Sequence, residues 1–142
     1  MATYNKFQQF VEDLAEQVHD LGADTLRVGL TNTIPVATNT IYGNITEIGA
    51  GNGYTAKGES TAQTISAHTT GTYKLTVTDV VWTAAGGTIG PFQYAVFYND
   101  TPAGPVDPLI GWHDYGSPLT LNNGESFTWD QDGAGNGILT LA

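Results

Sequence analysis

Residues 73–98 decide the fold, because two β-rich runs, YKLTVTDVVWT at 73–83 and FQYAVFY at 92–98, stand on either side of a small-residue turn. Aromatic and β-branched residues recur at alternate positions, a pattern typical of strands on a pleated, half-buried surface. The first run changes phase at Thr78 and Asp79, which predicts a β-bulge there. The second run is apolar at nearly every position. We therefore expect it to be covered on both faces and to lie centrally in an antiparallel β core.

Similar but shorter runs continue along the rest of the chain. Gly, Pro and Asn interrupt them at short intervals, and such spacing is typical of an all-β domain. About eight strands predict a mainly β fold, either an antiparallel β-sandwich or a jelly-roll-like barrel. We expect one domain, residues 1–142. The strands 119–121 and 127–129 are expected to flank a hairpin turn at Asn122-Asn123-Gly124. The full set of expected strands is 25–31, 63–67, 73–83, 92–98, 109–115, 119–121, 127–129 and 138–141.

One amphipathic helix is expected at residues 5–21, ahead of a β domain at 25–142. Large apolar residues recur there at spacings of three and four, which places them on one stripe. Asn5 is the expected N-cap, with Gln8 in the capping-box position, and Gly22 supplies the expected stop. The stripe packs either on its own β domain or on another subunit, and the sequence leaves both open. Its members are Phe7, Phe10, Val11, Leu14, Val18 and Leu21.

The charge of the chain excludes several classes of partner. Its 14 acidic and 4 basic residues give a formal net charge of -10. Nucleic-acid binding requires cations against phosphates, so we expect no nucleic-acid partner, and an anionic membrane surface would repel the chain. There is no apolar run of about 20 residues that could span a membrane. No signal-peptide pattern is found, so we expect synthesis and first use in the cytoplasm.

No set of residues in the sequence has the spacing of a catalytic, metal or cofactor site. The chain has no cysteine, and His19, His68 and His113 belong to separate expected elements. The segments at 49–53 and 133–137 repeat the letters GAGNG, but neither continues into a dinucleotide-binding fingerprint, so we interpret both as tight turns. We expect a protein that is not an enzyme and that holds no metal and no cofactor.

Six segments of the chain carry a resemblance to known proteins: ATYNKF at 2–7, LRVGLTNT at 26–33, ITEI at 45–48, GNGY at 51–54, GPFQYAVFYN at 90–99 and LIGW at 109–112. In these segments the chain resembles a family of small structural proteins of tailed bacteriophages. Members of this kind look like capsid cement, or decoration, proteins, which implies a role on the outside of the phage head, in a virion made in the host bacterial cytoplasm. The implied partners are the major capsid protein and further copies of the chain itself, as a dimer or trimer.

A cement protein needs a rigid body and ordered contact segments, and three segments here fit that need. They are the expected helix, the irregular excursion at 32–58 and the proline-rich loop at 102–108. Two alternatives remain: a tail or head-fibre adaptor, and a carbohydrate-binding β-sandwich with Trp or Tyr exposed around a groove. The candidate partner-contact residues are Phe7, Phe10, Val11, Leu14, Tyr42, Tyr54, Pro102 and Pro105.

Overall fold

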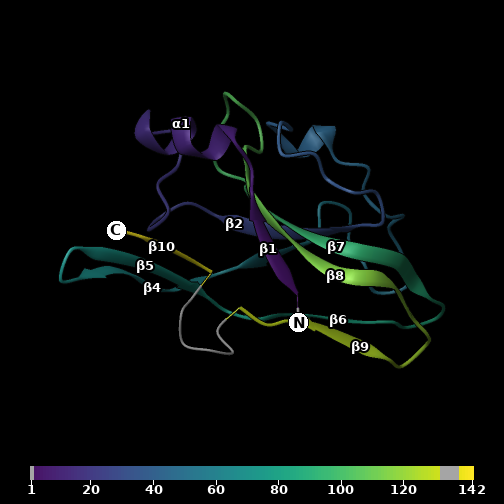
Figure 1. Ribbon diagram of the computed structural model, residues 1–142. Helices are drawn as coiled ribbons and strands as arrows, with labels where there is room; N and C mark the ends of the chain where they lie inside the picture. The colour runs from purple at the N-terminus through teal and green to yellow at the C-terminus, as the bar shows by residue number, and fades with distance from the viewer. Residues whose placement is uncertain (1, 132–137) are drawn as a thin grey trace.

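Ten strands and one short α-helix make up the computed structural model, which describes residues 2–131 and 138–142 (Figure 1). Strands account for 50% of the chain and helix for 7%, so the expected mainly β fold is confirmed. The helix is α1 (Gln9–Ala15), and η1 (Tyr42–Asn44) is a single 3₁₀ turn. The strands are β1 (Thr3–Lys6), β2 (Leu26–Thr31), β3 (Glu59–Thr61), β4 (Gln63–Thr69), β5 (Thr72–Val77), β6 (Val80–Thr83), β7 (Ile89–Asn99), β8 (Leu109–Leu121), β9 (Ser126–Trp129) and β10 (Leu139–Leu141).

The strands pair into three antiparallel sheets. The largest has the order β1-β8-β7-β2-β3, and the other two are β10-β5-β4 and β6-β9. β7 therefore lies between β8 and β2, as its continuous apolar sequence predicted. The two smaller sheets lie along one side of the five-stranded sheet, which gives a sandwich-like arrangement (Figure 1).

Alternate residues of β7 point into two different hydrophobic clusters. Ala95 and Phe97 face the cluster between the large and the small sheets, which we call the sandwich core. Tyr94, Val96 and Tyr98 face the opposite side of the large sheet, where a second cluster, the outer core, forms. Members of the sandwich core include Leu26, Val28, Leu75, Val77, Trp82, Phe97 and Trp129, and those of the outer core are Phe7, Tyr42, Tyr94, Val96, Tyr98, Leu109 and Trp112.

The expected helix at 5–21 is wrong in its bounds. Residues 3–6 form β1, in which Asn5 pairs with Trp112 instead of capping a helix. The residue before α1 is Gln8, and its side chain makes no capping hydrogen bond. The helix stops at Gln17, whose φ of 66° is left-handed, and the Val18 amide donates to the Asp13 carbonyl at 2.8 Å. These features form a Schellman-type cap that needs no glycine, so Gly22 is not the stop.

Three of the expected strands are divided or joined differently in the structure. The run at 73–83 divides at Thr78 and Asp79 into β5 and β6, which belong to different sheets, so the phase change marks a strand boundary and not a bulge. The runs at 109–115 and 119–121 are a single strand, β8. The turn at Asn122 is present, but it joins β8 to β9 across two sheets and not within one hairpin. Among the described residues, no helix is long and apolar enough to cross a membrane.

Candidate interaction surface

Three segments lie side by side and are joined by backbone hydrogen bonds, and the middle one contributes Tyr42 to the outer core. We call them the loop layer: α1, residues 32–48 and residues 100–108. The Gln8 amide, just before α1, donates to the Ala37 carbonyl at 2.9 Å, and the Tyr42 amide donates to the Asp107 carbonyl at 2.8 Å. The loop layer lies along one side of the molecule, opposite β6 and β9 (Figure 1). The fold thus brings together α1 and parts of the two loops, 32–58 and 102–108, that were expected to make contacts.

Two tyrosines expected at a partner interface instead anchor residues 42–54 to the large sheet. Tyr42 and Tyr54 are 5% and 2% exposed, and both hydroxyls donate to Oε1 of Glu47, at 3.0 and 2.6 Å. The Leu30 amide of β2 donates to the Tyr54 hydroxyl at 2.8 Å. Burial is the main cause that raises the pKa of both tyrosines, and Glu47 raises it further. These two residues are therefore internal supports of the loop layer.

Gly29 makes the position of Tyr42 possible. A Cβ atom at Gly29 would lie within 1.9 Å of the Tyr42 hydroxyl oxygen and 2.8 Å from its Cζ. The Tyr42 ring stacks on Tyr98 of β7, with ring centroids 4.1 Å apart. The aromatic pair and the missing side chain at Gly29 hold the layer close against the sheet.

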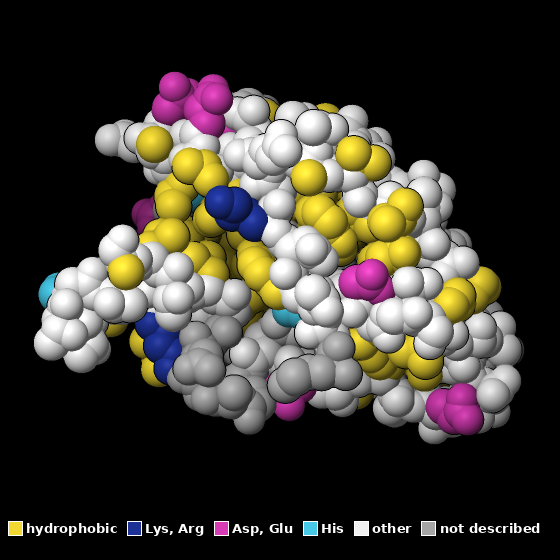
Figure 2. Space-filling model, viewed as in Figure 1, with side chains coloured by type: hydrophobic (Ala, Val, Ile, Leu, Met, Phe, Trp, Pro, Cys, Tyr) yellow, Lys and Arg dark blue, Asp and Glu magenta, His cyan; other side chains and the backbone are white. Residues whose placement is uncertain are grey.

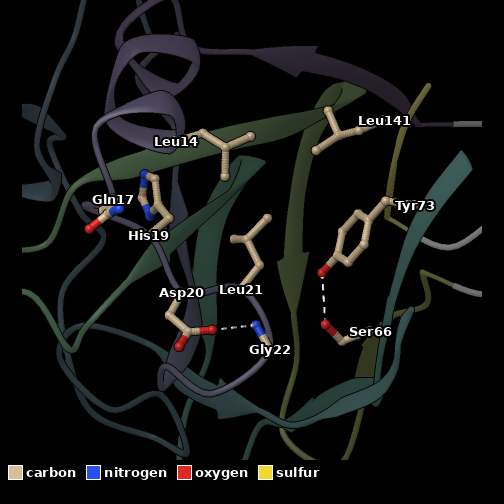
Figure 3. Close-up of a pocket in the computed structure, with 9 residues that line it drawn as sticks. All are labelled: Leu14, Gln17, His19, Asp20, Leu21, Gly22, Ser66, Tyr73 and Leu141. Atoms are coloured by element: carbon tan, nitrogen blue, oxygen red, sulfur yellow. Dashed lines mark hydrogen bonds between the residues drawn. The ribbon is translucent and has the colours of Figure 1, made fainter. Parts of the chain in front are cut away.

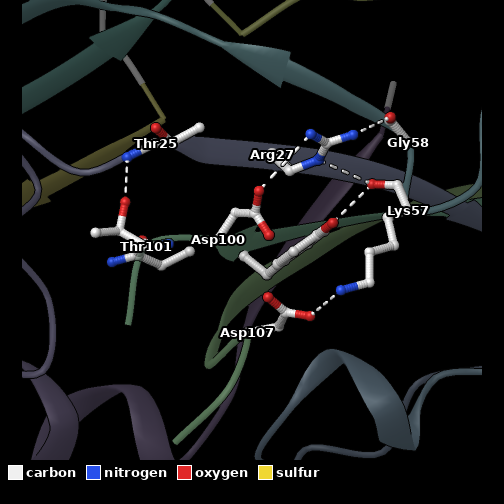
Figure 4. Close-up of polar contacts among 9 residues, drawn as sticks. Thr25, Arg27, Lys57, Gly58, Asp100, Thr101 and Asp107 are labelled. Carbon is white, nitrogen blue, oxygen red and sulfur yellow. Dashed lines mark hydrogen bonds and ion pairs between the residues drawn. The ribbon is translucent and has the colours of Figure 1, made fainter. Parts of the chain in front are cut away.

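A polar network fixes the third segment of the loop layer (Figure 4). Lys57 Nζ lies 2.8 Å from Oδ2 of the buried Asp107, and this hydrogen bond is the main cause that raises the pKa of Lys57. The Arg27 guanidinium donates to the Gly58 carbonyl at 2.7 Å and lies 3.7 Å from Asp100. Burial and the Asp107 carboxyl group raise the pKa of Asp100, whereas Arg27 lowers it. Two of the four basic residues of the chain are thus used to hold loops.

The loop layer carries half of the large hydrophobic side chains that are exposed among the described residues. Four of the eight belong to it: Val11 at 53%, Ile34 at 64%, Val36 at 54% and Val106 at 55%. Glu12 of α1 and Glu16, just after its end, are also exposed, and acidic side chains project from the helix in Figure 2. The layer therefore presents apolar side chains from each of its three segments, beside an acidic helix face.

The other expected contact residues divide between interior and surface. Phe7 and Phe10 are 0% and 3% exposed, so they are wrong as partner contacts, because they fill the cores of their own chain. Leu14 is half-buried and packs against the sandwich core, whereas Val11 is exposed. Pro102 is half-buried and Pro105 is exposed. The helix stripe thus packs largely on its own domain, one of the two alternatives that the sequence left open.

A pocket of about 650 Å³ lies beneath the end of α1, beside the β4–β5 hairpin (Figure 3). Leu14, Leu21 and Leu141 form much of its wall, and hydrophobic atoms line the corresponding hollow in Figure 2. The hydroxyl groups of Ser66 and Tyr73 lie 2.9 Å apart and satisfy each other. The wall is therefore mixed, because Gln17, His19 and Asp20 line the pocket beside the three leucines.

His19 also lines this pocket, but the protein already holds its ring. The Asn99 side-chain oxygen accepts from the Thr101 amide at 3.1 Å, which directs the Asn99 amide nitrogen toward Asp24, at 2.6 Å, and His19 Nδ1, at 3.1 Å. Nδ1 is therefore an acceptor, as in a neutral imidazole. Burial lowers the pKa of His19, and the nearby Asp13 and Asp24 partly oppose that decrease.

Residues that could suggest catalysis, metal binding or sugar binding have structural partners. Within residues 2–131 and 138–142, no three His, Cys, Asp or Glu side chains are arranged to hold a metal. Asp114 accepts from Gln93 Nε2 at 3.0 Å and from the Gly116 amide at 2.8 Å. Trp112 and Trp129, candidates for sugar stacking, are 8% and 0% exposed. The turn at 49–53 is formed, with Gly51 and Tyr54 bridged, while its repeat at 133–137 lies outside the described residues.

Sequence reasoning missed Ile34, Val36 and Val106 as candidate contact residues. All three lie in irregular segments, where no periodicity separates an exposed from a buried apolar side chain. A signal was available for Ile34 and Val36, because they flank Pro35 in a loop and so belong to no predicted strand.

Comparison with protein-family models, with curated proteins and with solved structures finds no match to this chain.

Proposed function

We propose that this protein is a capsid cement protein that binds the outer surface of a phage head and bridges neighbouring major capsid subunits. The observation that carries the proposal is the loop layer. Its three segments overlap those expected to make contacts, they are joined by hydrogen bonds, and they expose four large apolar side chains. The resemblance of the segments at 2–7, 26–33 and 90–99 to phage structural proteins supports the same role.

The physical effect of such binding is mass action. A protein that binds only the assembled shell, across two subunits, adds its binding free energy to the stability of the shell. Preorganised contact segments reduce the entropy lost on binding, and the anchors at Tyr42, Tyr54 and Asp107 supply that order. A jelly-roll-like wrapping of the strands stays a prediction, as does the absence of any catalytic activity.

The proposal is tested by binding of the purified protein to empty, expanded shells of the major capsid protein encoded near its gene. Cosedimentation and the temperature at which the shells disrupt are measured with and without saturating protein. We expect saturable binding and a higher disruption temperature. Val106→Asp should weaken binding at least tenfold, about 1.4 kcal/mol, because it places a charge in the apolar contact.

The matched control is Val81→Asp on β6, because Val81 and Val106 are equally exposed, at 55%. Val81 lies away from the loop layer, so this variant should bind like the wild type. Absence of binding by a folded wild-type protein would refute the cement role. Equal loss in both variants would show that the loop layer is not the contact surface.

A further inference from the structure

β4 is a long edge strand, and no other strand of the described residues pairs with its outer side. It is the outer strand of the sheet β10-β5-β4, and in Figure 1 it runs along the free side of a hairpin that extends from the body. Residues 64–69 are exposed on both faces, including Ile65 at 45%. Among the edge strands of the described residues, β4 has seven residues, whereas the others have three or four.

The β4–β5 turn determines which backbone groups point outward. Thr70 and Gly71 have φ angles of 49° and 86°, as a two-residue type I′ turn requires. Such a turn is closed by a hydrogen-bonded pair, here Thr69 and Thr72. Hydrogen-bonded and non-hydrogen-bonded pairs alternate along an antiparallel ladder. Ala67 therefore bonds toward β5, whereas the backbone N–H and C=O groups of Ser66 and His68 point to the open side.

The composition of this edge favours a second copy of the chain as its occupant. Natural edge strands usually carry Pro, Lys or another charged residue, which prevents pairing with a second chain. The sequence QTISAHT of β4 contains no Asp, Glu, Lys, Arg or Pro. At a net charge of -10, two copies repel each other over most of their surface. A long edge without carboxylates is a place where they can meet without that repulsion.

We propose that two copies of the free protein pair through their β4 strands, antiparallel about a two-fold axis, to form one continuous six-stranded sheet. An axis beside Ala67, the smallest side chain of the strand, places Ser66 of each copy opposite His68 of the other. The two outward-facing residues of each copy then exchange four backbone hydrogen bonds with the second copy. This pairing is independent of capsid binding, because β4 lies outside the loop layer.

The test is the mass of the free protein by light scattering and sedimentation equilibrium across a dilution series. We expect a reversible monomer–dimer equilibrium for the wild type. His68→Pro removes an outward N–H and leaves the β4–β5 ladder intact, so it should give a folded monomer at all concentrations. Ala67→Glu keeps every backbone group and places two carboxylates at the axis. It should raise the dimer dissociation constant at least tenfold.

Ser60→Glu on β3 is the matched control, because it places the same charge on another exposed edge strand. It should dimerise like the wild type. Hydrogen exchange should slow at the amides of Ser66 and His68 as concentration rises, with no such change at Ala67. A wild type that stays monomeric at all concentrations overturns the proposal, as does a dimer that survives Ala67→Glu. Should His68→Pro fail to fold, Ala67→Glu and the exchange pattern decide.

Discussion

β7 and β4 are both long and free of charged side chains, yet their surroundings are opposite. β7 lies between β8 and β2, and both of its faces are covered by hydrophobic clusters. β4 has one neighbouring strand, and residues 64–69 are exposed on both faces. β7 is rich in large apolar residues, whereas β4 consists mainly of small polar ones. Side-chain size and polarity therefore separate a strand that holds the body together from one that is free to meet a partner.

The largest expected effect comes from removing a side chain at the centre. Phe97 of β7 is 0% exposed, and its ring centroid lies 5.6 Å from that of Trp129. Phe97→Ala should lower the free energy of unfolding by about 3–5 kcal/mol, because it removes apolar contact and leaves a cavity in the sandwich core. Urea denaturation followed by tryptophan fluorescence measures the loss. A loss below about 1 kcal/mol would contradict the central role of β7.

A glycine on the neighbouring strand tests the outer face of the same sheet. Gly29→Ala on β2 should destabilise the protein by about 3 kcal/mol, the upper end for overpacking, because the new Cβ would overlap the Tyr42 hydroxyl. Thermal unfolding measures this loss. Combining Gly29→Ala with Tyr42→Phe should recover part of it, since the clashing oxygen is removed. No recovery would show that Tyr42 is not the obstacle.

Acid should weaken the protein through His113 on β8, the other neighbour of β7. Burial lowers the pKa of His113 to about 4, and its ring lies between those of Tyr4 and Trp129. The unfolded chain, in which the histidine has its ordinary pKa of about 6.5, takes up the proton more readily. The contribution of the neutral His113 to the free energy of unfolding is therefore complete above pH 6.5, and it is lost as the pH falls toward 4.

Between pH 7 and pH 5 this linkage amounts to about 2 kcal/mol. Urea unfolding at several pH values measures the slope. His113→Gln should flatten it, while His19, whose pKa is also lowered by burial, keeps part of the acid sensitivity. An unchanged slope in His113→Gln would contradict the assignment.

Local pattern predicted most of the strands, because alternation and continuous apolar runs report burial directly, but it missed the short edge strands β1 and β3. The helix bounds failed for a nonlocal reason. Phe7, Phe10 and Leu21 are all buried, as their spacing implied, but the pairing of β1 with β8 takes the first of them out of the helix. The end of the helix was also hard to predict, because the left-handed residue after it is Gln17 and not a glycine. Apolar spacing therefore predicted which side chains are inside, but not which element carries them.

The candidate contact residues were harder to predict than the contact segments. Parts of all three segments lie together in the loop layer, yet the aromatic residues chosen from the excursion at 32–58, Tyr42 and Tyr54, are buried supports. A large aromatic residue in an irregular loop can face either way. Its direction here depends on Glu47, within the same excursion, and on Gly29 of β2. Only the three-dimensional structure distinguishes these anchors from exposed residues such as Val36.

The smallest expected effect concerns β4 itself. Ile65→Thr keeps a β-branched side chain on an exposed strand, so it should change the free energy of unfolding of the monomer by about 0.5 kcal/mol or less. Urea unfolding is measured at a protein concentration low enough to exclude association, beside Phe97→Ala under the same conditions. Because Ile65 is 45% exposed and Phe97 is 0% exposed, the two losses should differ several-fold. Comparable losses would mean that β4 is packed within its own chain, and the contrast between the edge and the centre would fail.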